Sequence, residues 1–168
     1  IELKSQKAIN LKNIKFSGKR TSTIEIVQNE LATQLNMPVK KINLCVYPNN
    51  TLGNEGFEIS YKNNIISITS PSDKGLMYGA YALIRKSRIG ETPKEGTVIT
   101  EKPKNALRLL NHWDNLNGNV ERGYAGKSIF WGEKNTPLKN IKSEDGKTSV
   151  YDKRILDYAR ANALVGNL

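Results

Sequence analysis

Residues 70–87 read SPSDKGLMYGAYALIRKS, and this stretch predicts a helix with one buried face. Ser72 or Asp73 can cap the helix, because a short polar side chain accepts a hydrogen bond from the exposed N–H groups of the first turn. The apolar side chains recur at helical spacing, at Leu76, Ala80, Leu83 and Ile84. Basic residues in the last turn suit the helix dipole, and Gly90 is expected to end the helix. The neighbouring segments must therefore cover an apolar helix face.

A second helix is expected over residues 22–35, STIEIVQNELATQL. Ser22 and Glu25 have the spacing of a capping box, in which each side chain bonds to the backbone of the other residue. The apolar stripe that follows consists of Ile24, Val27, Leu31 and Leu35.

The strands predicted for this part of the chain lie within residues 7–18, 42–47, 56–70 and 96–100. Asn63 and Asn64 separate two β-rich runs, and asparagine tolerates the positive φ of a tight hairpin. Pro103 interrupts regular structure and marks a linker. Residues 1–103 are therefore expected to form an autonomous α/β sandwich domain, a mixed sheet with two helices on one face.

Composition narrows the possible functions. The chain has 168 residues, 38% of them hydrophobic, and a formal charge of +10, so it can bury a core and attract anionic partners. Basic and aromatic residues are not interleaved as they are on surfaces that stack nucleic-acid bases, which argues against a nucleic-acid partner.

The sequence has no run of about 18 apolar residues, so no membrane span is predicted. The chain starts at Ile1 with no hydrophobic signal sequence, and we expect a processed or excised polypeptide.

Cys45 is the single cysteine, and it lies within an apolar run. It cannot form an internal disulfide, and its expected role is that of a small buried hydrophobic residue. The sequence therefore predicts neither redox chemistry nor a cysteine-based metal site.

After the linker at residues 101–105 the pattern changes. Residues 106–113, ALRLLNHW, are expected to form a buried strand, followed by a polar loop over 114–150 and a helix from about Asp152. Strand, long loop and helix form the repeating unit of a (β/α)₈ barrel, whose active residues follow the strands. A complete barrel takes about 250 residues. Residues 104–168 are therefore expected to be the incomplete start of a catalytic barrel.

The stretch RLLNHWDNLNGNVERGYAGKSIFW, residues 108–131, holds the only His and both Trp of the chain. His112 alone could be a structural histidine and Trp113 alone a packing residue. Together with Asp, Asn, Glu, Arg and Tyr in one glycine-rich loop, they favour a carbohydrate subsite. Arg122 could recognise a carboxylate through two parallel hydrogen bonds.

The same stretch resembles the first barrel strand and loop of the microbial α-glucuronidases of glycoside hydrolase family sixty-seven, on its NHWDNL, ERGYAG and SIFW motifs. Residues 72–85, SDKGLMYGAYALIR, resemble a helix of that family's N-terminal domain, which several hexosaminidase-type enzymes share. The resemblance implies an inverting hydrolase that removes glucuronic acid, or its 4-O-methyl ether, from xylo-oligosaccharides in xylan breakdown. It implies no metal and no organic cofactor.

The resemblance assigns substrate contact to Glu121, Arg122, His112, Trp113 and Asn115, with Lys127 as an alternative partner of the uronate. Asp114 and Tyr124 are assigned to the architecture of the loop. The acid and base of the family lie on later barrel strands, and we do not take Asp114 and Glu121 as that pair. The chain is therefore expected to be inactive by itself.

Two other classes of protein remain open at this stage. The chain could be a non-catalytic carbohydrate-binding module, or part of another barrel glycoside hydrolase such as a hexosaminidase relative. The sequence beyond Leu168 would discriminate between them, because barrel repeats with Glu and Asp at strand ends would support the glucuronidase.

Overall fold

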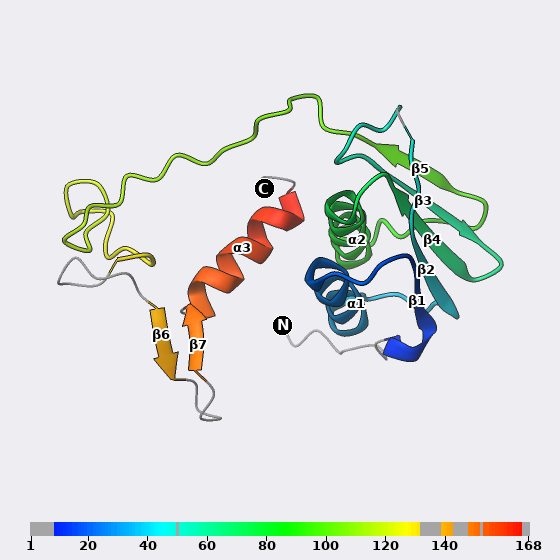
Figure 1. Cartoon of the computed structure of the whole chain (residues 1–168), viewed down its shortest axis with the longest axis horizontal. Helices are drawn as coiled ribbons and strands as arrows, with labels where there is room; N and C mark the ends of the chain where they lie inside the picture. The colour runs from blue at the N-terminus through cyan, green and yellow to red at the C-terminus, as the bar shows by residue number, and fades with distance from the viewer. Residues whose placement is uncertain (1–8, 50, 132–138, 143–147, 152, 166–168) are drawn as a thin grey trace. The chain divides into compact units, whose positions relative to one another are not determined.

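A five-stranded mixed sheet forms the framework of the first part of the protein (Figure 1). The computed structural model describes residues 9–49, 51–131, 139–142, 148–151 and 153–165. The chain divides into two units, Ile1–Ala106 and Leu107–Leu168. The elements of the first unit are η1 (Leu11–Asn13), β1 (Ile14–Ser17), α1 (Ser22–Gln34), β2 (Lys41–Val46), β3 (Phe57–Lys62), β4 (Ile65–Ser70), α2 (Asp73–Arg88) and β5 (Val98–Glu101).

The strands follow the order β1-β2-β4-β3-β5. β1, β2 and β4 run parallel, whereas β3 is antiparallel to both of its neighbours. The predicted hairpin joins β3 to β4, and Asn63 and Asn64 adopt φ values of 53° and 60°. Because both turn residues have positive φ, the turn matches the right-handed twist of the two strands. The hairpin prediction is confirmed.

Both helices cover the same face of the sheet (Figure 1). Side chains alternate across a strand, so every second residue points toward the helices. The fully buried residues of the central strands include Ile42, Leu44, Ile59, Ile66 and Ile68, each no more than 1% exposed. Burying each such side chain stabilises the fold by about 1.5–3 kcal/mol. The residues between them, such as Asn43, Ser60 and Ser67, are polar and only half-buried, which matches a sheet with one apolar face.

The N-cap of α1 lies one residue before the one expected from the sequence. Thr21, and not Ser22, is the N-cap: its Oγ1 accepts a hydrogen bond from the backbone N–H of Ile24 at 3.3 Å. Thr21 has extended backbone angles, while Ser22 already lies within the helix. The capping box predicted from Ser22 and Glu25 was therefore wrong. The apolar stripe of α1 is confirmed, since Ile24, Val27, Leu31 and Leu35 are all buried.

The two helices are joined at both ends. The Thr21 hydroxyl donates to Oδ2 of Asp73 at 2.9 Å, which links the N-termini of α1 and α2. At the other end, the backbone N–H of Asn36 donates to Oγ of Ser87 at 3.2 Å. Arg88 also donates to the side-chain oxygen of Gln34. The helices are thus fixed in register and point in the same direction.

The helix α2 approaches the sheet through two glycines. A Cβ atom at Gly75 would lie 1.9 Å from Oγ of Ser70, and one at Gly79 would lie 2.7 Å from Cγ2 of Ile68. Ser70 itself is buried, and its hydroxyl donates to the carbonyl of Gly56 at 2.7 Å. Ser72 caps α2 by accepting from the N–H of Gly75 at 3.1 Å, as expected.

The second unit contains β6 (Lys139–Lys142), β7 (Thr148–Tyr151) and α3 (Lys153–Val165). β6 and β7 pair antiparallel, so the predicted loop over 114–150 contains a two-stranded ribbon that sequence analysis missed. The predicted helix is confirmed as α3, although Asp152 lies outside the described residues. Residues 132–138 and 143–147 of the predicted loop also lie outside them.

The strand expected at residues 106–113 was wrong, because the structure has no regular element there. Leu107 is 73% exposed and Leu109 is 77% exposed, whereas a barrel strand would bury such side chains. A strand exists only by pairing with a neighbour, and in the described part of the chain no strand pairs with residues 106–113. The barrel start is therefore not seen as a strand in this structure.

Across the described residues, none of the helices is both long and apolar enough to traverse a lipid bilayer.

Replacing Gly79 with alanine should destabilise the first unit. The added methyl group would press on Ile68 and also lie 3.1 Å from Cγ of Phe57; such overpacking costs about 1–3 kcal/mol. Alanine gains about 1 kcal/mol of helix propensity over glycine, so we expect the free energy of unfolding to fall by up to about 2 kcal/mol in urea titrations. The control is Asn29→Ala, at an exposed position of α1. A rise of about 1 kcal/mol in the free energy of unfolding of Gly79→Ala, the full propensity gain, would show that α2 can move away from the sheet at no cost.

Candidate functional site

The loop that holds the sequence-predicted site is built from tight turns. The backbone N–H of Glu121 donates to the carbonyl of Trp113 at 2.7 Å, and isolated bridges pair Asp114 with Val120 and Asn119 with Lys127. Glu121 has a φ of 52°, a left-handed conformation that is uncommon outside glycine. The glycines of the loop with positive φ are Gly118, Gly123 and Gly126. These turns give the loop a defined backbone.

Two polar side chains hold the loop together. The amide nitrogen of Asn115 donates to the carbonyl of Asn119 at 3.2 Å and also to the carbonyl of Glu121. Ser128 is 3% exposed, and its Oγ accepts from the backbone N–H groups of Phe130 and Trp131 at 2.9 and 3.1 Å. Asn115, predicted as a substrate contact, therefore uses its amide nitrogen to support the loop.

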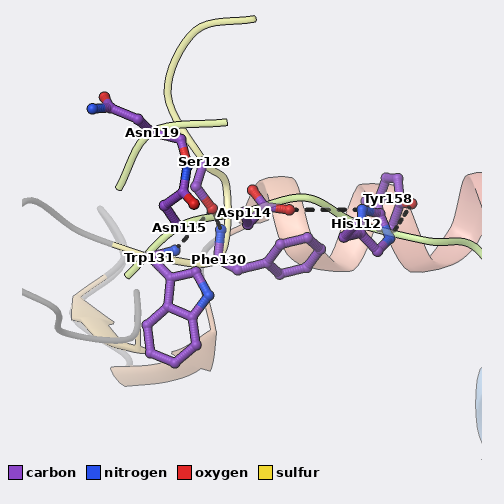
Figure 2. A network of polar contacts seen from close by, with 8 residues as sticks. All are labelled: His112, Asp114, Asn115, Asn119, Ser128, Phe130, Trp131 and Tyr158. Carbon is purple, nitrogen blue, oxygen red and sulfur yellow. Dashed lines mark hydrogen bonds and ion pairs between the residues drawn. The ribbon is translucent and has the colours of Figure 1, made fainter. Parts of the chain in front are cut away.

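His112 forms the centre of a polar and aromatic cluster (Figure 2). Its Nε2 is hydrogen-bonded to the Tyr158 hydroxyl at 2.7 Å, and Tyr158 belongs to α3. The His112 ring also makes edge contacts with the rings of Phe130 and Tyr158, with centroids 5.2 and 5.3 Å apart. The cluster therefore joins the loop to α3, two segments that are 46 residues apart in sequence.

Asp114 lies on the other side of His112 (Figure 2). Its Oδ2 is 3.8 Å from Nδ1 of His112, which is an ion-pair distance and too long for a hydrogen bond. The side chain of Asp114 is 9% exposed, while that of His112 is 39% exposed. The imidazole is thus positioned between a sheltered carboxylate and a phenol, with part of its surface open to a ligand.

The other residues predicted to contact substrate differ in how much of their surface is exposed to solvent. Trp113 is 57% exposed, Arg122 is exposed and Glu121 is half-buried. Trp113 and Glu121 are brought together by a hydrogen bond between their backbones. An exposed indole face and an exposed guanidinium are the groups that stack on a sugar ring and recognise a carboxylate.

Sequence reasoning missed three residues of the cluster. Ser128 and Phe130 lie in the quoted stretch, but only their place in the folded turn shows their role. Tyr158 lies within the helix that the sequence predicts from about Asp152, but its contact with His112 has no local signal in the sequence.

The described residues contain no group of three or more His, Cys, Asp or Glu that could hold a metal ion. What the arrangement offers is a set of hydrogen-bonding groups, one sheltered carboxylate and one exposed indole. These groups fit recognition of a polar ring better than direct bond cleavage.

The sequence of this chain is similar to proteins of one enzyme class, the glycoside hydrolases. Residues 89–167 match the family model described as "Glycosyl hydrolase family 67 middle domain". The chain is 33% identical over 90 residues to the alpha-glucuronidase of Hypocrea jecorina, which covers 50% of this chain and 10% of that protein. It is 31% identical over 111 residues to a probable alpha-glucuronidase A of Aspergillus fumigatus, which covers 66% of this chain and 12% of that protein.

The chain thus spans about a tenth of the length of these curated relatives. Among solved structures, it overlaps with a GH20 beta-N-acetylhexosaminidase from Streptomyces coelicolor at a TM-score of 0.43 and 18% identity, over 60% of this chain and 24% of that one. The family match and the names of these relatives support the assignment of this chain to the glucuronidase-type glycoside hydrolases.

Replacing Tyr158 with phenylalanine should remove the hydrogen bond that joins His112 to α3. The change removes the hydroxyl and keeps the ring contacts, and one hydrogen bond contributes about 0.5–1.5 kcal/mol. Since His112 is the only histidine, its ring nitrogens give unambiguous ¹⁵N NMR signals. We expect the Nε2 signal to shift in Tyr158→Phe and to stay unchanged in the control Tyr124→Phe, whose ring is 76% exposed. Identical ring spectra in all three proteins would contradict the His112–Tyr158 contact.

Proposed function

We propose that this chain is the N-terminal part of an inverting α-glucuronidase that removes glucuronic acid, or its 4-O-methyl ether, from xylo-oligosaccharides. The observation that carries the proposal is the match of residues 89–167 to the family 67 middle domain, because this range includes the loop, His112 and α3. The names of the relatives support the glucuronidase activity. The N-terminal sheet and its helices then form an accessory domain, and residues 104–168 begin the catalytic barrel.

In this proposal the loop recognises the sugar. Trp113 offers an exposed aromatic face to a sugar ring, and His112 contributes the open part of its imidazole. Glu121 accepts hydrogen bonds from hydroxyl groups, since an ionised carboxylate has only acceptor atoms. Asn115 contributes through its amide oxygen, because the amide nitrogen is occupied by the loop carbonyls.

Arg122 is the proposed partner of the uronate carboxylate. Its guanidinium can donate two parallel hydrogen bonds to the two carboxylate oxygens, a geometry that an ammonium group cannot reproduce. Lys127 is the alternative partner. The positive formal charge of the chain favours approach of the anionic sugar.

Inverting hydrolysis requires an acid and a base about 6.5–9.5 Å apart on opposite sides of the bond. Asp114 is sheltered and faces His112, so its carboxylate is engaged within the loop. We therefore assign Asp114 to loop architecture and propose that the acid and the base come from residues outside these 168. No metal and no organic cofactor takes part in this mechanism.

The first test of this proposal is the stereochemistry of the reaction. A longer polypeptide that carries these 168 residues and the barrel should release uronic acid from an aldouronic oligosaccharide. ¹H NMR of the fresh product should show the β anomer before mutarotation, because inversion acts on an α-linked sugar. Retention of the α anomer, or reaction with hexosamine substrates alone, would contradict the assignment.

A second prediction concerns the 168 residues by themselves. They should release no uronic acid from the same substrate, since in this proposal the loop supplies recognition but neither of the two catalytic carboxyl groups. The assay compares this chain with the longer polypeptide at equal molar concentration. Sustained release by the 168 residues alone would mean that Asp114 or Glu121 takes part in catalysis.

A further inference from the structure

The first unit contains a groove that the proposed function does not use. It has a volume of about 490 Å³, within the range of small-molecule sites. The groove runs between α1 and the strand β1, and its residues are Leu11, Lys12, Ile14, Lys15, Phe16, Arg20, Glu25, Gln28 and Asn29. It belongs wholly to the first unit and is separate from the loop around His112.

The floor of the groove is held in place by a buried hydrogen bond. The side-chain nitrogen of Gln28 donates to the carbonyl of Ile14 at 3.0 Å, and both residues are less than 8% exposed. This bond fixes α1 against β1. β1 is an edge strand that pairs only with β2, so along the described part of the chain its other edge is not covered by a strand. The groove is therefore bordered by a fixed helix and a strand edge with backbone hydrogen-bonding groups.

The charge of the lining is predominantly positive. The lining contains three basic residues, Lys12, Lys15 and Arg20, and one acidic residue, Glu25. All four are exposed, and within the described residues none of them takes part in an ion pair. Cations that have no ion-pair partner among the described residues attract an anionic ligand, and guanidinium groups are suited to carboxylates.

The other lining groups suit a sugar. Asn29 offers an exposed amide, which can both donate to and accept from hydroxyl groups. Phe16 is half-buried, and Leu11 is 48% exposed, so the groove also has apolar surface for the C–H face of a ring. We propose that this groove binds a carboxylate-bearing saccharide at a second site, with the carboxylate on Arg20 and the hydroxyls on Asn29.

The excess of basic residues in the groove is by itself the reason to expect an anionic ligand. The choice of a sugar acid over a simple carboxylate rests on the proposed function, which would bring uronate-bearing oligosaccharides to the protein. A second site in the first unit would then hold a substituted xylan fragment in addition to the one bound by the loop.

The test is a titration of the ¹⁵N-labelled 168-residue chain, followed by ¹H–¹⁵N NMR. D-Glucuronate should cause saturable shifts at Arg20 and Asn29, with a dissociation constant in the millimolar range. D-Glucose, which has the ring without the carboxylate, and acetate, which has the carboxylate without the ring, should each bind about tenfold more weakly. Shifts confined to residues 112–131 would overturn the second site and leave the loop proposal intact.

Matched variants assign the effect to the groove. Arg20→Gln should weaken glucuronate binding about tenfold, since one charge-assisted hydrogen bond is lost. Lys94→Gln makes the same change in net charge at an exposed turn before β5, at the opposite edge of the sheet. It should bind glucuronate like the unmodified chain. Equal weakening in both variants would mean that net charge alone attracts the anion, which would overturn the proposal.

Two further outcomes are informative. If acetate binds as tightly as glucuronate at the same residues, the groove does not select a sugar acid, and that part of the proposal fails. If the groove binds glucuronate but the longer polypeptide has no glucuronidase activity, the second site stands and the proposed function fails.

Discussion

The close approach of α2 to the sheet is the constraint on which the first unit depends. Gly75 and Gly79 let the helix backbone reach Ser70 and Ile68 at distances that a methyl group would prevent. Only at this distance can the apolar side chains of α2 reach the central strands, where Ile66 and Ile68 are fully buried. Because protein interiors are packed as densely as organic crystals, a shift of this helix would be felt across the whole core.

The features that sequence analysis predicted correctly are those with local causes. Asn63 and Asn64 adopt positive φ because the hairpin needs it, and Ser72 caps α2 through its own neighbouring N–H groups. The cap of α1 was displaced by one residue, because Thr21 and Ser22 have equivalent side chains for capping. What separates them is the contact of Thr21 with Asp73, which lies 52 residues further along the chain.

The features that were missed depend on distant partners. Residues 106–113 have the apolar composition of a strand, but composition cannot supply the neighbouring strand with which they would pair. Tyr158 shows the same limit, since its bond to His112 joins two segments that no sequence period relates. Of the candidate site, the sequence therefore indicated the loop and its chemical character, while the folded turns decided that Asn115 supports the backbone.

The links between α1 and α2 have a consequence for how the first unit opens. Two helices that point the same way place like ends of their dipoles side by side, an arrangement that favours separation. Here the Thr21–Asp73 bond lies at one pair of ends and the Asn36–Ser87 bond at the other. Fraying of one helix end therefore releases a partner on the other helix, so local opening of the two helices is coupled. We therefore expect amide protons near the linked ends of both helices to become exposed to solvent in the same opening events.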